Sequence, residues 1–266
     1  MNKLYFFYTL ILFIPIQALA NYPPYDAVAI SLGGSSVTYI SPFSIGFNPA
    51  NLCYSPPKIS INAQNRYGIQ QYSKVLLIGN YRLDKSAISI SYQAENGVVL
   101  NQKITLAFAK KFNQNLATGV TLNINRLSSQ NAYYQNSNIL TFNAGLHYQI
   151  NTRNSIGFQI ENPNQSQITE YPEENLPVRI KLGMNHKLTK KIGTYIDALQ
   201  SNNQKINLCV GVELIKDDYK FRTGFNLNQM IGCGISFKKE SFLIEVGLSF
   251  HNHLGASPSL NTSYAW

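Results

Sequence analysis

The sequence predicts an all-β protein: a transmembrane antiparallel up-and-down β-barrel of about 14 strands, with an N-terminal plug segment in its lumen. From Lys58 onward, apolar residues alternate with small or polar ones at period two, which is typical of strands with one apolar and one polar face. Charged residues make up only 13% of the 266 residues, whereas aromatic residues make up 12%. The chain also begins with the features of a secretory signal peptide, which predicts export.

Residues 1–20 carry those features in order. Lys3 precedes an apolar run over 4–16, and Ala18-Leu19-Ala20 supplies the small residues of a cleavage site, so the mature chain is expected to start at Asn21. An uncleaved anchor is the alternative. The run is too short to span a bilayer, and no later window approaches the roughly 20 apolar residues of a spanning helix. No Cys follows the cleavage site, so a lipid anchor is not expected.

Residues 21–57 form a separate unit. They contain no Lys or Arg, a single acid in Asp26, and six of the eleven prolines. Such a segment suits neither a lipid-facing strand nor a solvated tail. We therefore expect it to fold into the lumen as a plug, with a periplasmic cap or docking tail as the alternative, and we expect residues 58–266 to form the barrel.

The period-two segments predict fourteen strands, whose connections alternate between tight and long. Tight connections at one rim, longer loops at the other and an even strand number are typical of bacterial outer-membrane barrels, with both termini periplasmic. Prolines beyond Pro57 are expected between strands. A soluble β-sandwich or propeller gives similar alternation and is the alternative. The strands are expected near 58–67, 73–82, 86–93, 102–111, 116–127, 138–150, 155–161, 177–188, 192–199, 205–215, 219–227, 230–238, 241–250 and 258–266, with long loops at 94–101, 128–137 and 162–176.

The last expected strand ends the chain on an aromatic residue. Tyr264 and Trp266 share one face with Leu260 and Thr262. Outer-membrane barrels commonly end in this way, so these two residues are expected to form the signal that the β-barrel assembly machinery reads. The expected partners are therefore that machinery and the lipid of the outer membrane.

Six charged residues are expected to face the lumen, because they fall between lipid-facing apolar residues of their strands. They could form a charged constriction or bind an anionic headgroup. Alternatively, they form salt bridges that hold the barrel open, an interpretation that their mixed signs favour. They are Arg179, Lys181, Glu213, Lys220, Arg222 and Glu245.

No other pattern indicates a catalytic, cofactor or metal site. His251 and His253 have no nearby carboxylate or thiol to complete a metal site. His186 lies outward with no distinctive Ser motif to indicate a lipase. The pair Gly33-Gly34 lacks the Lys of a phosphate-binding loop. We therefore expect a protein that is not an enzyme and has no cofactor.

The cysteines and the basic residues indicate neither a metal site nor a nucleic-acid-binding protein. Cys53, Cys209 and Cys233 are odd in number and match no metal spacing, so they are expected to be packing residues. The formal net charge of +9 comes from Lys and Arg scattered singly along the chain. Without a continuous basic run, no nucleic-acid partner is expected.

Two stretches of the N-terminal unit resemble the signature of PorV/PorQ-type outer-membrane proteins of Bacteroidota, which are relatives of the FadL fatty-acid transporters. The first, 29–37, contains Gly33-Gly34, and the second, 43–52, contains Asn48-Pro49-Ala50. In that family an Asn-Pro-Ala-Gly-Leu element precedes the first strand, and here Asn51 replaces its Gly. The resemblance implies a fourteen-stranded barrel with an N-terminal segment in the lumen, but it does not decide between two functions.

The first hypothesis is a plugged channel or transporter for a small molecule, hydrophobic ones included, in the cell outer membrane of a Gram-negative bacterium. The alternative is an accessory component of a type IX-like secretion or envelope-assembly system. In that case the loops or the plug would bind secretion-system or envelope proteins.

Overall fold

The computed structural model describes residues 26–97, 100–128, 136–166, 176–202, 204–228 and 230–266. The expected signal peptide, 1–20, and the following residues 21–25 lie outside these ranges. Within the described residues, no helix has the length and apolar character needed to cross a membrane.

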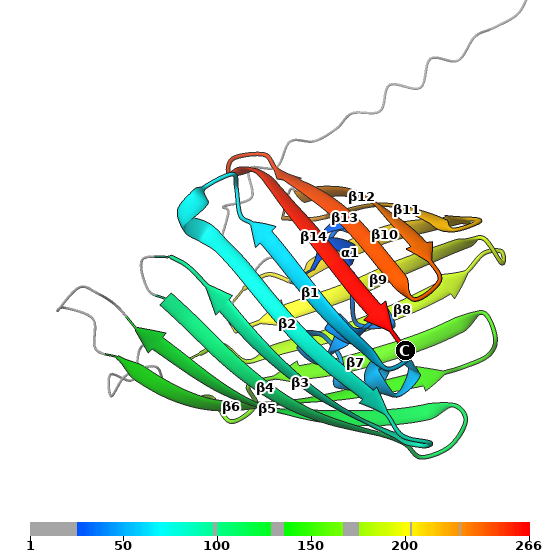
Figure 1. Ribbon diagram of the computed structural model, residues 1–266, viewed down its shortest axis with the longest axis horizontal. Coiled ribbons are helices and arrows are strands. Elements are labelled where there is room, and N and C mark those ends of the chain that lie inside the picture. The colour runs from blue at the N-terminus through cyan, green and yellow to red at the C-terminus, as the bar shows by residue number, and fades with distance from the viewer. Residues whose placement is uncertain (1–25, 98–99, 129–135, 167–175, 203, 229) are drawn as a thin grey trace, which may run out of the picture.

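Fourteen antiparallel strands close into one barrel, in which each strand pairs with its chain neighbours and β1 pairs with β14 (Figure 1). The predicted fold class is therefore confirmed, and every predicted strand overlaps an observed one. The strands are β1 Lys58–Asn65, β2 Ser73–Arg82, β3 Ser86–Glu95, β4 Leu100–Lys111, β5 Leu116–Ser128, β6 Ser137–Gln149, β7 Asn154–Glu161, β8 Arg179–Lys187, β9 Ile192–Ser201, β10 Asn207–Lys216, β11 Tyr219–Asn226, β12 Met230–Lys239, β13 Phe242–His251 and β14 Gly255–Ala265.

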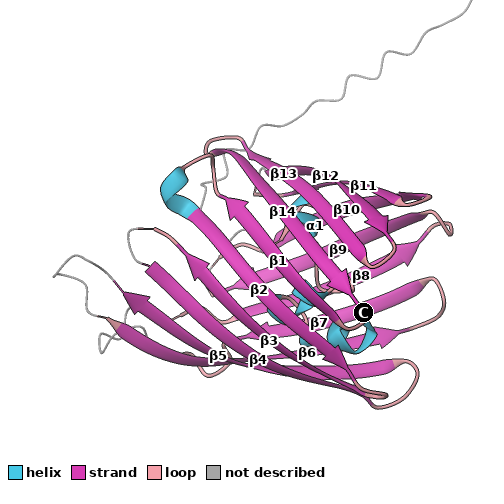
Figure 2. Ribbon diagram, in the orientation of Figure 1, coloured by secondary structure: helices cyan, strands magenta, loops and turns pink. Residues whose placement is uncertain are grey.

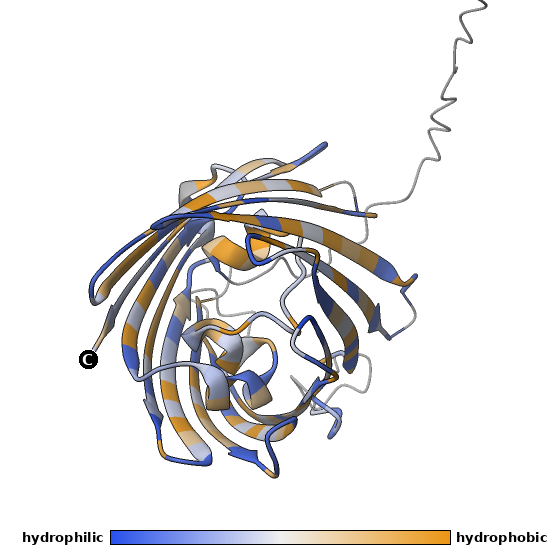
Figure 3. Ribbon diagram, turned by 90° about the vertical axis from the view of Figure 1, so that its right-hand side faces the viewer, coloured by the Kyte–Doolittle hydropathy of each residue, from blue (hydrophilic) through white to orange (hydrophobic). Residues whose placement is uncertain are grey.

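The barrel carries its apolar side chains on the outside. In β5, Leu122 and Ile124 are 43% and 47% exposed, whereas Thr121 and Asn123 are only 2% and 1% exposed. Figure 3 shows the resulting stripes along the strands. A protein in water buries these apolar groups, so this arrangement is stable only in lipid. The alternative of a soluble sandwich or propeller is wrong.

The two rims differ as predicted. Connections at 83–85, 112–115, 150–153, 188–191, 217–218 and 240–241 form one rim, here called the turn rim, where the C-terminus also lies (Figure 1). The opposite rim, the loop rim, receives the long connection between β7 and β8 and a 3-10 helix, η3 (Gln70–Tyr72). Asp217 and Glu240 take positive φ values of 53° and 51°, which suits two-residue hairpin turns.

Two expectations about strand ends are wrong. The loop expected at 94–101 is shorter, because β3 continues to Glu95 and β4 begins at Leu100. Pro258 was expected between strands, yet it lies inside β14, opposite Leu248 of β13. The pairing of β14 with β1 extends only to Ser259, so Pro258 sits where β14 has one neighbour. A residue without an N–H is tolerated at such an edge.

A folded segment, residues 26–55, lies inside the barrel (Figures 2 and 3). It contains α1 (Ala27–Ser31) and two 3-10 helices, η1 (Pro42–Gly46) and η2 (Pro49–Tyr54). Each helix begins at a polar cap: Asp26 accepts from Ala29 N at 2.7 Å, Ser41 from Phe43 N, and Asn48 from Ala50 N. These caps satisfy N–H groups that have no partner within the helices themselves.

The lumen segment and the wall share a hydrophobic core. Phe43, Ile45 and Leu52 of the segment pack with Leu76 and Ile78 of β2, and all five are nearly fully buried. This core lies against β2 to β5 and holds η1 and η2 to that side of the lumen.

Candidate functional site in the lumen

The wall that faces the lumen segment has glycines where other residues would project side chains. A Cβ at Gly119 would lie 2.6 Å from Ala50 N, and a Cβ at Gly211 would lie 2.8 Å from Leu32 Cβ. A residue with a Cβ would clash with the segment at either position. The glycines therefore allow the segment to lie directly on the backbone of the wall. This glycine belt, on β5 to β8 and β10 to β13, comprises Gly119, Gly145, Gly157, Gly183, Gly211, Gly224, Gly232, Gly234 and Gly247.

Asp197 of β9 anchors the segment to the wall. Its Oδ2 accepts hydrogen bonds from the backbone N of Ser36 at 2.6 Å and from that of Val37 at 2.9 Å. Hydrogen bonds to an ionised acceptor are about twice as strong as neutral ones. Asp197 was not among the expected lumen residues, although its alternation with the outward Ile196 places it on the lumen face.

The predicted plug motif shapes the segment rather than forming a ligand pocket. Asn48 Nδ2 donates to Val37 O and to Leu146 O of β6, both at 2.9 Å. Pro49 and Ala50 begin η2 and lie against Gly119.

Gly33 and Gly34 of the same motif turn the chain between α1 and Ser36. Gly33 has φ +68° and Gly34 has φ +103°, and a Cβ at Gly33 would meet the backbone of Phe225 at 2.5 Å from its O. Asn226 Nδ2 also donates to Gly33 O at 2.9 Å. Only glycine combines this conformation with this close approach.

The six charged residues expected in the lumen all belong to lumen-facing positions, but they form two clusters at opposite rims. At the loop rim, Glu161 binds Lys181 at 2.8 Å and Arg179 at 3.2 Å. Glu161, the last residue of β7, was not predicted as a lumen residue. Its partners lie on β8, beyond the long β7–β8 connection. A single constriction made by all six residues is therefore not formed.

The second cluster lies toward the turn rim. Arg222 of β11 binds Glu213 at 2.8 Å and Glu245 at 3.5 Å, and its Nη2 donates to the hydroxyl of Tyr39 in the lumen segment at 2.9 Å. Lys220 lines a pocket together with Tyr39 and Glu245 of this cluster. The Arg222 cluster thus ties the segment to three strands of the wall.

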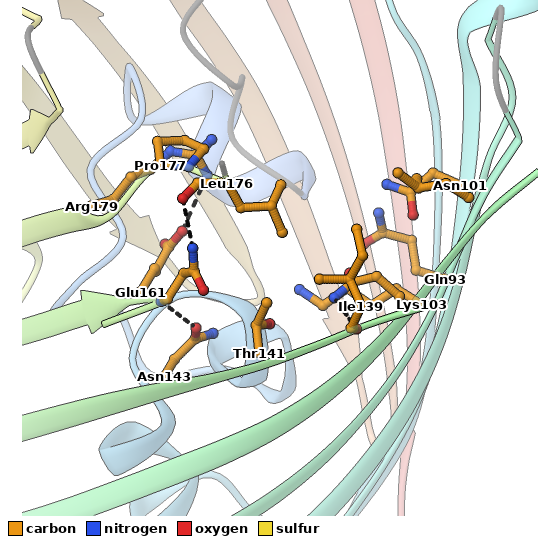
Figure 4. Close-up of a pocket in the computed structure, with 13 residues that line it drawn as sticks. Gln93, Asn101, Lys103, Ile139, Thr141, Asn143, Glu161, Leu176, Pro177 and Arg179 are labelled. Atoms are coloured by element: carbon orange, nitrogen blue, oxygen red, sulfur yellow. Dashed lines mark hydrogen bonds and ion pairs between the residues drawn. The ribbon is translucent and has the colours of Figure 1, made fainter. Parts of the chain in front are cut away.

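A pocket of about 170 Å³, the loop-side pocket, opens beside the Glu161 cluster (Figure 4). One part of its lining is apolar, formed by Leu127, Ile139, Leu176 and Pro177. The remainder is polar or charged, formed by Gln93, Asn101, Lys103, Asn125, Thr141, Asn143, Glu161, Asn162 and Arg179.

Below this pocket the lumen narrows at η1. A cavity of about 20 Å³, lined by Phe43, Ile45 and Leu76, shares Gln93 and Lys103 with the loop-side pocket. This volume holds about one water molecule.

On the other side of η1 lies the turn-side pocket, about 400 Å³, lined by residues that include Tyr39, Pro42, Lys58 and Lys220. Because Pro42 lines the turn-side pocket and Phe43 lines the small cavity, η1 separates the two larger pockets.

The remaining candidates form no site among the described residues. The rings of His251 and His253 lie 6.1 Å apart at the loop rim, and the part of the chain that the structure describes holds no group of three His, Cys, Asp or Glu suited to a metal. His186 Nδ1 contacts Asn154 Oδ1 at 2.5 Å. Cys53 and Cys209 are buried free thiols, and Cys233 is an exposed one.

No protein-family model matches the sequence, and no curated relative matches it. Solved structures share the fold. The CymD monoaromatic hydrocarbon channel has a TM-score of 0.74 at 12% identity and covers 91% of this chain and 98% of its own. The toluene transporter TodX of P. putida has a TM-score of 0.74 at 10% identity, over 92% of this chain and 99% of its own. A FadL homologue of Pseudomonas aeruginosa has a TM-score of 0.67 at 12% identity, over 91% and 98%.

Proposed function

We propose that this protein is an outer-membrane channel for small hydrophobic molecules, kept closed to ions by residues 26–55. We orient the barrel as in other outer-membrane barrels, with the turn rim and both termini in the periplasm and the loop rim at the cell exterior. The monoaromatic hydrocarbon channel CymD and the toluene transporter TodX, which share this fold, support this substrate class.

The size and lining of the loop-side pocket carry the proposal. Its volume of about 170 Å³ is close to that of an engineered apolar cavity of about 150 Å³ that binds benzene. Leu127, Ile139, Leu176 and Pro177 offer apolar contact to one face of such a ligand. A single-ring molecule is therefore accommodated, whereas an oligosaccharide is too large.

Passage beyond this pocket requires η1 to move. The cavity beside Phe43 and Ile45 has a volume of only about 20 Å³, too small for a ring. A shift of η1 toward the turn-side pocket would join the three spaces. We propose that η1 is the gate of the channel.

Uptake of radiolabelled toluene by cells that express the protein tests this function. We expect faster uptake than in cells without it, and a loss of that gain with Ile139→Arg, which places a cation in the pocket. Lys205→Gln, an exposed residue of the loop rim, is the matched control and should retain uptake. Unchanged uptake at normal amounts of folded wild-type barrel would contradict the proposal.

The alternative of a secretion or envelope-assembly accessory of the PorV/PorQ type rests on the motif around Gly33 and Asn48. In this structure those residues contact the barrel wall, so they are not free to bind another protein. Stable co-purification with a large envelope complex, without any toluene uptake, would favour this role instead.

Two further proposals accompany the channel. Tyr264 pairs with Ile59 and Phe242 where the barrel closes, and we propose that Tyr264 and Trp266 form the signal for the assembly machinery. We also propose that the protein is not an enzyme, because the charged groups described in its lumen, around Glu161 and Arg222, are engaged in ion pairs with one another.

A further inference from the structure

Basic residues that are scattered along the chain converge at one part of the turn rim. An up-and-down barrel brings every second connection to the same rim. The connections 112–115, 150–153 and 188–191 are adjacent there, because Gln149 N donates to Asn115 O at 2.7 Å and Lys187 N donates to Arg153 O at 2.8 Å. Side chains that are about 40 residues apart in sequence therefore share one surface.

This surface, the basic sector, consists of Lys110, Arg153, Lys187, Lys190 and Lys191, all exposed. The stretches 110–116, 147–155 and 186–193 contain no Asp or Glu. The ion pairs that Glu95, Glu161, Glu213 and Glu245 form lie in the lumen or at the loop rim, and they include no residue of the sector.

The rest of the turn rim differs. Its connections carry the exposed acids Asp84, Asp217, Asp218 and Glu240 beside their lysines. Among the described turn-rim connections, those between β4 and β9 carry basic residues and no acid of their own. The acid-bearing connections with Asp84 and Asp217 adjoin the two ends of the sector, through the hydrogen bonds from Lys111 N to Lys85 O and from Ile215 N to Lys191 O.

Each connection of the basic sector also exposes a large apolar residue. Phe112, Ile150 and Leu188 are 63%, 46% and 53% exposed and continue the lipid-facing surface of the strands. Apolar side chains at the membrane edge, with basic side chains just beyond them, match the boundary between acyl chains and headgroups.

We propose that the basic sector binds the phosphate groups of anionic phospholipids in the leaflet that surrounds the turn rim. Charge complementarity supports this ligand, since each basic residue near an anionic leaflet contributes about 1 kcal/mol. The inference concerns the outside of the barrel, so it stands independently of what the channel carries.

A fluorescence experiment on the full-length mature protein tests the inference. Trp266 is the single tryptophan, and it follows β14, which lies half-way round the fourteen-strand order from β7. A reporter variant with Phe112→Trp and Trp266→Phe moves the fluorophore into the basic sector. Quenching is measured in vesicles whose brominated lipid is either phosphatidylglycerol or phosphatidylcholine.

We expect brominated phosphatidylglycerol to quench the reporter at position 112 in clear preference to brominated phosphatidylcholine. Lys110→Gln with Arg153→Gln in the reporter background should lower that preference about thirtyfold, because each of the two residues contributes a factor of about five, which corresponds to about 1 kcal/mol. Arg126→Gln with Lys205→Gln, which removes two exposed charges near the loop rim, should leave it unchanged. The unmodified Trp266 should show a weaker preference.

Equal quenching of the reporter by the two lipids would overturn the inference, and an acidic polypeptide would then be the remaining ligand class for this surface. A preference that survives Lys110→Gln with Arg153→Gln, or that falls equally in the loop-rim control, would also overturn it. Heat-modifiable migration on gels verifies that each variant is folded, so loss of the barrel is not mistaken for loss of lipid binding.

Discussion

Asn51 Oδ1 lies 2.7 Å from Nδ1 of His147, and this contact joins η2 of the lumen segment to β6 of the wall. Asn51 Nδ2 also donates to Val37 O at 2.9 Å and to Tyr39 O at 3.1 Å. Asn51 thus connects three parts of the lumen: η2, β6 and the stretch 37–39 of the segment.

Removing this side chain should destabilise the folded protein. Asn51→Gly and Asn51→Ala each leave the buried Nδ1 of His147 without its Asn51 partner, and Val37 O keeps only its hydrogen bond from Asn48 Nδ2, which together cost about 1–3 kcal/mol. Reversible urea unfolding in lipid measures the effect. Similar losses for both variants would attribute it to the hydrogen bonds rather than to glycine flexibility. Changes within about 0.5 kcal/mol for both would contradict this role.

The glycine belt makes a second prediction. Gly119→Ala places a methyl group against the backbone of Pro49 and Ala50, so the segment must shift at a cost of about 1–3 kcal/mol. Gly79→Ala in β2 is the matched control, since its new Cβ would meet only Ile90 Cγ2 at 3.7 Å. We expect Gly119→Ala to lower the free energy of unfolding more than Gly79→Ala does. Equal free energies of unfolding for the two variants would show that the segment is not held tightly.

The third prediction concerns the depth of two lipid-facing leucines in the membrane. Leu106 in β4 and Leu83 in the β2–β3 turn are 48% and 45% exposed, but Leu106 lies mid-strand. Leu106→Arg should destabilise the barrel by about 2–4 kcal/mol, and Leu83→Arg by about 0–1 kcal/mol. The same unfolding assay compares them. Equal effects would contradict the placement of the lipid-facing belt.

The seating of α1 should depend on pH through Asp26. Burial is the main cause that raises the pKa of Asp26 from 3.8 to about 7; the hydrogen bond from Ala29 N opposes this rise, and the nearby charge of Glu245 contributes to it. Between these two values the seated segment binds a proton that a released segment loses, so seating weakens as pH rises toward 7. We expect the channel to open more often in planar bilayers at about pH 8 than at about pH 5.5. Asp26→Asn should remove this dependence, and a wild-type record without it would contradict the interpretation.

Local patterns were sufficient to predict the strands, but the contacts inside the lumen depend on register. Alternation such as Val120 outward and Thr121 inward is visible in any short window, because lipid and lumen select opposite residues. The contact of Asp197 with Ser36 joins positions 161 residues apart and follows only from the closed barrel. For the same reason the six charged lumen residues, alike in the sequence, separate into two clusters.

Single-channel conductance in planar bilayers tests the central claim that residues 26–55 close a lumen which otherwise conducts. The intact mature protein is compared with a form that lacks residues 24–55, each verified as a folded barrel by heat-modifiable migration. We predict that the intact protein shows little ion conductance and that the deleted form conducts markedly more, because removing the segment joins the loop-side and turn-side pockets. Equal conductance of the two folded forms would contradict the claim.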